Sequence, residues 1–142
     1  MKREILLSDK NHPVFASLYT WKTRMLQTHE VTIHHQKTSL TGGDFLFLVS
    51  CTEIIEKRVR AKYRHALVLH ASDLPNGRGW SPHIWAILNG ATKVTVTLLE
   101  AEDLLDSGYI WAKTPVAIPK TALWDEINDK IFNAQIRLMD HA

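Results

Sequence analysis

The sequence contains little cysteine, glycine or proline, and it has no long apolar run. Its single cysteine, Cys51, has no partner within the chain, which excludes an internal disulfide. No apolar stretch approaches the roughly 18 residues that a membrane-spanning helix needs. The apolar residues at positions 5–7 are too few for the apolar region of a secretory signal. These absences predict a cytoplasmic protein with no membrane partner.

A strong excess of charge of one sign is also missing. The 17 Lys and Arg residues against 15 Asp and Glu give a net charge of +2, which does not indicate a nucleic-acid partner. The densest basic stretch covers residues 57–64, and a nucleic-acid patch would use such side chains to displace counterions. Glu53 and Glu56 precede the stretch, so the solvated face of a helix is the alternative, and we favour it.

What the chain does contain is enough for one globular domain, with 142 residues of which 45% are apolar. Strands are expected at about residues 4–8, 29–34, 45–49, 66–69, 92–98 and 109–113. Helices are expected from Pro13 to about residue 27, from Thr52, over residues 81–88, and from Thr121 with Leu123, Ile127, Ile131, Ala134 and Leu138 on the inner face. The run at 45–49 is apolar on both faces, as in a parallel strand covered by helices. This alternation predicts an α/β fold with a largely parallel sheet flanked by helices.

His70 directly follows the apolar strand at residues 66–69. Polar groups at the carboxyl ends of strands form the binding sites of such folds, and histidine acts as an acid or stabiliser near neutral pH. A structural histidine bonded within the sheet is the alternative. Asp106 precedes Ser107 and Gly108, so it is either a site carboxylate or a turn residue.

Two further histidines, His34 and His35, invite the hypothesis of a metal site. Neighbouring residues of a strand point to opposite faces, and two ligands do not make a set, so no metal is expected. Cys51 follows an apolar strand, where a small buried side chain is the simplest role.

Three ordered motifs resemble those of the folate-dependent formyltransferases. Residues 70–79 are similar to the family's histidine followed by Ser-Leu-Leu-Pro and Arg-Gly. Residues 81–90 resemble its helix that ends in Asn-Gly. Residues 94–98 and 105–110 are similar to its Val-Thr and Asp-x-Gly-x-Ile segments. The resemblance is clear over about residues 45–112 and weak elsewhere.

The resemblance implies a Rossmann-like formyltransferase domain that transfers a formyl group from the co-substrate 10-formyltetrahydrofolate to an amine. It implies that His70 and Asp106 are catalytic. Ser72 is close to His70 in the sequence and is a candidate catalytic hydroxyl donor, the alternative being a hydroxyl that bonds within its own loop. The folate pocket is expected at Cys51, Ile54, Ile55, Glu102 and Leu105. The substrate loop is expected at Leu74, Pro75, Arg78 and Gly79.

Val68 departs from the family pattern, which has an asparagine two residues before the histidine. That asparagine amide holds the formyl oxygen as it gains negative charge, and valine has no donor to replace it. The leading hypothesis is a formyltransferase that acts on a small amine, such as an amino sugar or a sugar nucleotide. A non-catalytic folate or metabolite binder is the alternative, and an interaction module is a third hypothesis.

Two features indicate a shortened version of the family's domain. Residues 34–44 leave little room for a full strand–helix unit, and the first turn, at residues 8–13, lacks the family's glycine. We therefore expect residues 1–142 to form a single, shortened formyltransferase-like domain.

Overall fold

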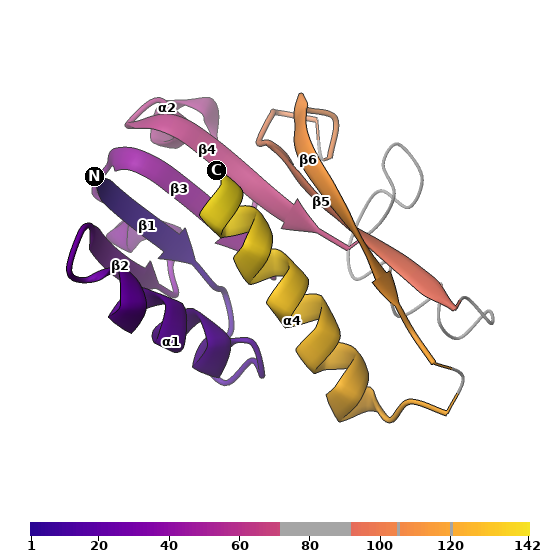
Figure 1. Cartoon of the computed structure of the whole chain (residues 1–142). Coiled ribbons are helices and arrows are strands. Elements are labelled where there is room, and N and C mark those ends of the chain that lie inside the picture. Colours follow the sequence, from indigo (N-terminus) through magenta and orange to yellow (C-terminus); the bar gives the residue numbers. More distant parts are fainter. Residues whose placement is uncertain (72–91, 105, 120) are drawn as a thin grey trace.

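The structure, a computed structural model, describes residues 1–71, 92–104, 106–119 and 121–142 (Figure 1). In this part of the chain six strands form one sheet in the order β2-β1-β3-β4-β5-β6. The strands are β1 (Lys2–Leu6), β2 (Glu30–His34), β3 (Gly43–Val49), β4 (Tyr63–His70), β5 (Lys93–Glu100) and β6 (Ile110–Ala117). The helices are α1 (Phe15–Met25), η1 (Lys37–Ser39, a 3₁₀ turn), α2 (Lys57–Arg60) and α4 (Trp124–His141).

The sheet is parallel on one side and antiparallel on the other. β1 pairs in parallel with β2 and β3, and β3 pairs in parallel with β4. β5 then runs antiparallel to β4, and β6 antiparallel to β5. The predicted α/β fold with a largely parallel sheet is therefore confirmed, with an antiparallel hairpin added at one edge.

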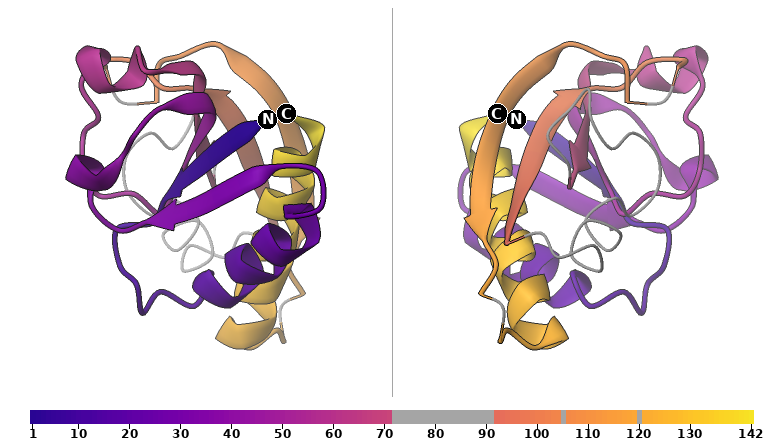
Figure 2. Two further views of the ribbon diagram at one scale, coloured as in Figure 1. Left: turned by 90° about the vertical axis from the view of Figure 1, so that its left-hand side faces the viewer. Right: turned by 90° about the vertical axis from the view of Figure 1, so that its right-hand side faces the viewer.

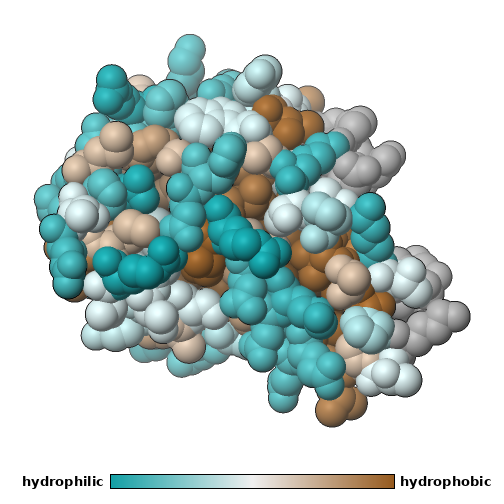
Figure 3. Space-filling model, in the orientation of Figure 1, coloured by the Kyte–Doolittle hydropathy of each residue, from teal (hydrophilic) through white to brown (hydrophobic). Residues whose placement is uncertain are grey.

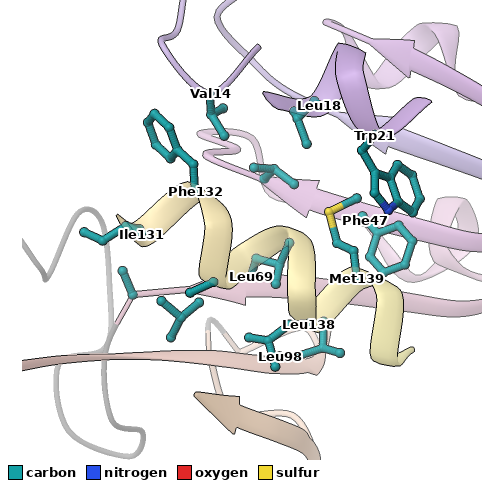
Figure 4. Packing of buried hydrophobic residues seen from close by; sticks show 14 of the residues in the cluster. Val14, Leu18, Trp21, Phe47, Leu69, Leu98, Ile131, Phe132, Leu138 and Met139 are labelled. Carbon is teal, nitrogen blue, oxygen red and sulfur yellow. The ribbon is translucent and has the colours of Figure 1, made fainter. Parts of the chain in front are cut away.

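The main hydrophobic core lies between the sheet and the helices α1 and α4 (Figures 2 and 4). Leu18 and Trp21 of α1 and Ile131, Leu138 and Met139 of α4 are almost fully buried there. The outward side of α4 carries hydrophilic residues (Figure 3), as expected for an amphipathic helix that covers a sheet. The predicted inner face of the last helix is thus confirmed for four of its five residues, namely Ile127, Ile131, Ala134 and Leu138.

A smaller core covers the opposite face of the sheet. It contains Leu6, Leu40, Leu46, Leu48, Ile55 and Tyr63, with Cys51, Val59, Ala66, Val68 and Ala101 packed against it. β3 contributes to both cores, because Phe45, Phe47 and Val49 lie in the main core and Leu46 and Leu48 in the smaller one. This confirms the expectation of a strand buried on both faces.

Some local predictions were wrong. Leu123 is 70% exposed because α4 begins only at Trp124, and Thr121 does not cap it. Thr52 caps no helix either, because α2 is a single turn that begins at Lys57. Only η1 lies between β2 and β3, which confirms the short connection expected there. The helix expected at residues 81–88 lies outside the described residues. Within the described residues, no helix is long and apolar enough to cross a membrane.

Candidate functional site

β4 places His70 at the carboxyl end of the parallel strands. Leu67 and Leu69 of this strand, and Ala71 directly after it, lie in the main core, whereas Val68 packs against the smaller one. Because side chains alternate along a strand, His70 lies on the same face as Val68. Its side chain is 8% exposed.

Asp106 meets His70 on this face of the sheet. Nε2 of His70 lies 3.5 Å from Oδ2 of Asp106, and the aspartate side chain is only 2% exposed. Asp106 has a left-handed backbone with φ of 55°, which aspartate tolerates better than most residues. It is thus both a turn residue and a buried carboxylate aimed at an imidazole, and a carboxylate so placed restricts the orientation of the histidine ring.

The loop between β5 and β6 (the 101–109 loop), of which residues 101–104 and 106–109 are described, brings Asp106 to this place. At its base the Glu100 amide donates to the Tyr109 carbonyl at 2.8 Å, and the Ala101 amide donates to the Ala66 carbonyl at 2.8 Å. Gly108 is required here, because a Cβ at this position would lie 1.9 Å from the Glu100 carbonyl oxygen. These contacts anchor the base of the loop beside Ala66 of β4, and the contact of Asp106 with His70 places that part of the loop near the end of the same strand.

The residues expected to line a folate pocket are only partly grouped. Ile55 is 4% exposed in the smaller core, whereas Ile54 is 62% exposed, so the two side chains diverge. Cys51 is half-buried, its thiol donates to the Glu53 carbonyl at 3.4 Å, and burial raises the pKa of that thiol. Glu102 is exposed. Ile55 therefore belongs to the smaller core, against which Val68 also packs, whereas Ile54 offers its apolar side chain to solvent.

The remaining predicted site residues lie outside the described part of the chain. These are Ser72, Leu74, Pro75, Arg78, Gly79 and Leu105. Their assignment remains a prediction from the sequence motifs.

A buried carboxylate that the sequence analysis did not single out lies on the same face of the sheet. Glu4 is 1% exposed, and its Oε1 accepts hydrogen bonds from the amide of Gly42 at 2.8 Å and the hydroxyl of Tyr63 at 2.7 Å. The amide and hydroxyl of Thr41 donate to the same atom, and His34 contacts Oε2. Burial alone would raise the pKa of Glu4, but the donors outweigh it and hold that pKa below its ordinary value. The sequence signal that could have indicated this buried carboxylate is a glutamate within an apolar strand, here β1.

His34 and His35 point in different directions, as expected. His34 contacts Glu4, whereas Nδ1 of His35 lies 2.9 Å from the carbonyl oxygen of Leu7. Within the described residues no group of three or more His, Cys, Asp or Glu side chains is arranged to hold a metal ion.

Comparison with known proteins assigns the class of this Rossmann-like fold. Residues 4–142 match the formyl transferase family, and the chain belongs to that family. Over 91 residues it is 37% identical to the methionyl-tRNA formyltransferase of Clostridium acetobutylicum, a match that covers 63% of this chain and 29% of that protein. The chain thus spans less than a third of the length of this relative.

Solved structures share the fold at low sequence identity. A methionyl-tRNA formyltransferase from Clostridium thermocellum superposes with a TM-score of 0.78 at 23% identity, covering 99% of this chain and 66% of that one. A sugar N-formyltransferase from a Shewanella species gives a TM-score of 0.72 at 15% identity, covering 99% and 68%. A phosphoribosylglycinamide formyltransferase from Bacillus halodurans gives 0.68 at 17% identity, covering 97% and 91%.

Proposed function

We propose that this protein transfers a formyl group from 10-formyltetrahydrofolate to the amine of a small acceptor. Membership of the formyl transferase family supports the reaction class. The observation that carries the proposal is the contact of His70 with Asp106, at 3.5 Å and largely out of solvent, at the carboxyl end of β4. A buried imidazole and carboxylate are the groups that acyl transfer to an amine needs.

In the proposed reaction the neutral amine attacks the formyl carbon, and a new C–N bond forms. The carbonyl oxygen gains negative charge, which His70 stabilises as an imidazolium. The bond from the formyl carbon to N10 of the folate then breaks. The amine loses one proton and N10 gains one, with Asp106 orienting His70 and accepting a proton through water. The products are a formamide and tetrahydrofolate, with no covalent enzyme intermediate.

The exposed face of Ile54 fits one requirement of the folate. A flat pterin ring binds against apolar side chains, and Ile54 offers such a surface on the segment that follows β3. Cys51, Glu102 and Leu105 are proposed to complete this pocket. The neutral thiol of Cys51 suits a packing role there.

For the acceptor, we propose an amino sugar or sugar nucleotide. Part of the basic stretch at 57–64 is engaged within the protein, since Arg58 pairs with Glu56 at 3.1 Å and Arg60 with Asp103 at 2.8 Å. These pairs reduce the positive charge available to a nucleic acid. Methionyl-tRNA is the second candidate, because the Clostridium acetobutylicum relative is named for that substrate.

The competing hypothesis is a folate or metabolite binder without catalysis, because Val68 occupies the place of the family's asparagine. The experiment is an assay of tetrahydrofolate release from 10-formyltetrahydrofolate with amino-sugar nucleotides, glycinamide ribonucleotide and methionyl-tRNA in parallel. Turnover with an amino-sugar nucleotide supports the proposal. Turnover with methionyl-tRNA alone would identify methionyl-tRNA as the acceptor instead. Folate binding in calorimetry without turnover supports the hypothesis of a non-catalytic binder. The absence of both folate binding and turnover refutes 10-formyltetrahydrofolate as the donor.

A further inference from the structure

Arg60 joins two segments that flank the candidate site. Its backbone belongs to α2, and its side chain is 10% exposed. Nη1 donates to the carbonyl oxygen of Ile55 at 2.6 Å, and Nη2 donates to Oδ1 of Asp103 at 2.8 Å. One guanidinium therefore ties the segment after β3 to the 101–109 loop, and Figure 2 shows α2 close to that loop.

The contacts of Arg60 differ from those of its neighbour Arg58. Arg58 is 86% exposed and pairs with Glu56 of its own segment, and pairs of that kind contribute little to stability. Arg60 instead uses the fixed fork of its guanidinium on a backbone carbonyl and a carboxylate, and its own side chain is shielded from water although that of Asp103 is 79% exposed. Arg60 thus has the geometry of a structural clamp, and Arg58 provides a matched control.

The loop that Arg60 holds is the one that carries Asp106. Asp103 lies three residues before Asp106, beyond the hydrogen bonds that fix the base of the loop. The contact between Asp106 and His70 is already long, at 3.5 Å, so a small displacement of the loop would separate the two side chains. The ion pair between Arg60 and Asp103 attaches the part of the loop around Asp103 to α2.

We propose that Arg60 is a positioning residue for formyl transfer. By holding Asp103, it fixes the 101–109 loop at the distance from which Asp106 meets His70. Arg60 needs no contact with either substrate for this role. The inference rests on the proposed function for its catalytic consequence, whereas its geometric part concerns only the protein.

The geometric part is tested by NMR of the full chain without substrates. The ring resonances of His70 are assigned and compared in Arg60→Met, Arg58→Met and Asp103→Asn variants. Asp106→Asn defines how these resonances change when the facing carboxylate is lost. Arg60→Met and Asp103→Asn should shift them in the direction of the Asp106→Asn spectrum, and Arg58→Met should leave them in place. Wild-type resonances in both Arg60→Met and Asp103→Asn, or an equal shift in Arg58→Met, would overturn the proposal.

The catalytic part is tested by steady-state kinetics with the acceptor found above. Arg60→Met should lower kcat about tenfold with less than a twofold change in KM, because misplaced catalytic groups slow the chemical step. Asp103→Asn should do the same, and the double variant should be no slower than Arg60→Met alone. Arg60→Lys should recover part of the rate. An unchanged kcat in a folded Arg60→Met variant overturns the role. A wild-type protein without formyl transfer refutes the proposed function instead, and the NMR comparison then decides the clamp alone.

Discussion

Replacing Val68 with asparagine tests whether this site lacks a donor for the formyl oxygen. Val68 lies two residues before His70 on the same face, a spacing of about 6.6 Å along a strand. A group bound beside His70 is therefore within reach of an amide at position 68. Restoring one donor to a developing oxyanion is worth up to roughly 10²–10³ in rate. Val68→Asn should raise kcat toward that range if the missing amide is the main defect.

The cost of the substitution comes from the smaller core. Val68 is half-buried and packs with that cluster. An amide left without a partner there would lower the free energy of unfolding by about 1–3 kcal/mol. Because the side chain keeps some exposure, we expect the lower half of this range and a folded variant. Urea unfolding measures the cost separately from the kinetics.

The assay is tetrahydrofolate release at saturating donor and acceptor, with folate binding measured by calorimetry. Val68→Leu is the control, because leucine has the same branching and number of side-chain heavy atoms as asparagine but no donor. A gain in Val68→Asn that Val68→Leu lacks supports oxyanion stabilisation at this position. Equal or lower turnover in Val68→Asn, with folate binding intact, would refute the argument and indicate that other groups stabilise the oxygen.

Three further outcomes are expected. His70→Ala should lower kcat by at least about 10²-fold, on the order expected for loss of an acid or an oxyanion donor. Its circular dichroism spectrum should be unchanged, and wild-type turnover in this variant would show that His70 is not catalytic. Tyr63→Phe should lower the free energy of unfolding by about 1.5–3 kcal/mol at pH 7, because Glu4 loses a charge-assisted hydrogen bond. The lowered pKa of Glu4 means that its stabilisation is full above the ordinary glutamate pKa of about 4.3 and is lost as the pH falls through the lowered value. The Tyr63→Phe deficit in urea should therefore shrink as the pH is lowered below about 4.3, and a constant deficit would contradict this assignment. Gly108→Ala should lower both Tm and kcat, because its methyl group cannot fit against the Glu100 carbonyl, and a wild-type Tm would contradict the close contact.

The strands and the main helix face could be predicted because burial leaves a period in the sequence. The run at 45–49 predicted a strand buried on both faces, and the spacing of Ile127, Ile131 and Leu138 predicted a face of α4. Local capping signals were less reliable. Thr52 lies too far from the single turn of α2, and Leu123 precedes the helix that it was expected to help bury.

The pairing of distant polar groups could not be predicted from such periods. The motif resemblance singled out His70 and Asp106 separately, but their contact depends on how the β5–β6 hairpin joins β4. The contacts of Arg60 with Asp103 and of Glu4 with Tyr63 join residues 43 and 59 positions apart. No local pattern encodes these distances, because they result from the order of strands in the sheet.

Because β5 pairs antiparallel with β4, the candidate site lies between two parts of the sheet, the parallel strands and the β5–β6 hairpin. His70 belongs to the parallel part and Asp106 to the hairpin. Among the described residues the register between β4 and β5 runs over four residue pairs, from Leu67 with Glu100 to His70 with Thr97. A ligand that contacts both parts stabilises the pairing of β4 with β5. Its binding should therefore slow amide hydrogen exchange in β5 and β6. By the same linkage, a change that loosens the hairpin weakens binding before it unfolds the parallel part. For a ligand that contacts both His70 and Asp106, affinity should therefore fall as the attachment of the hairpin is loosened.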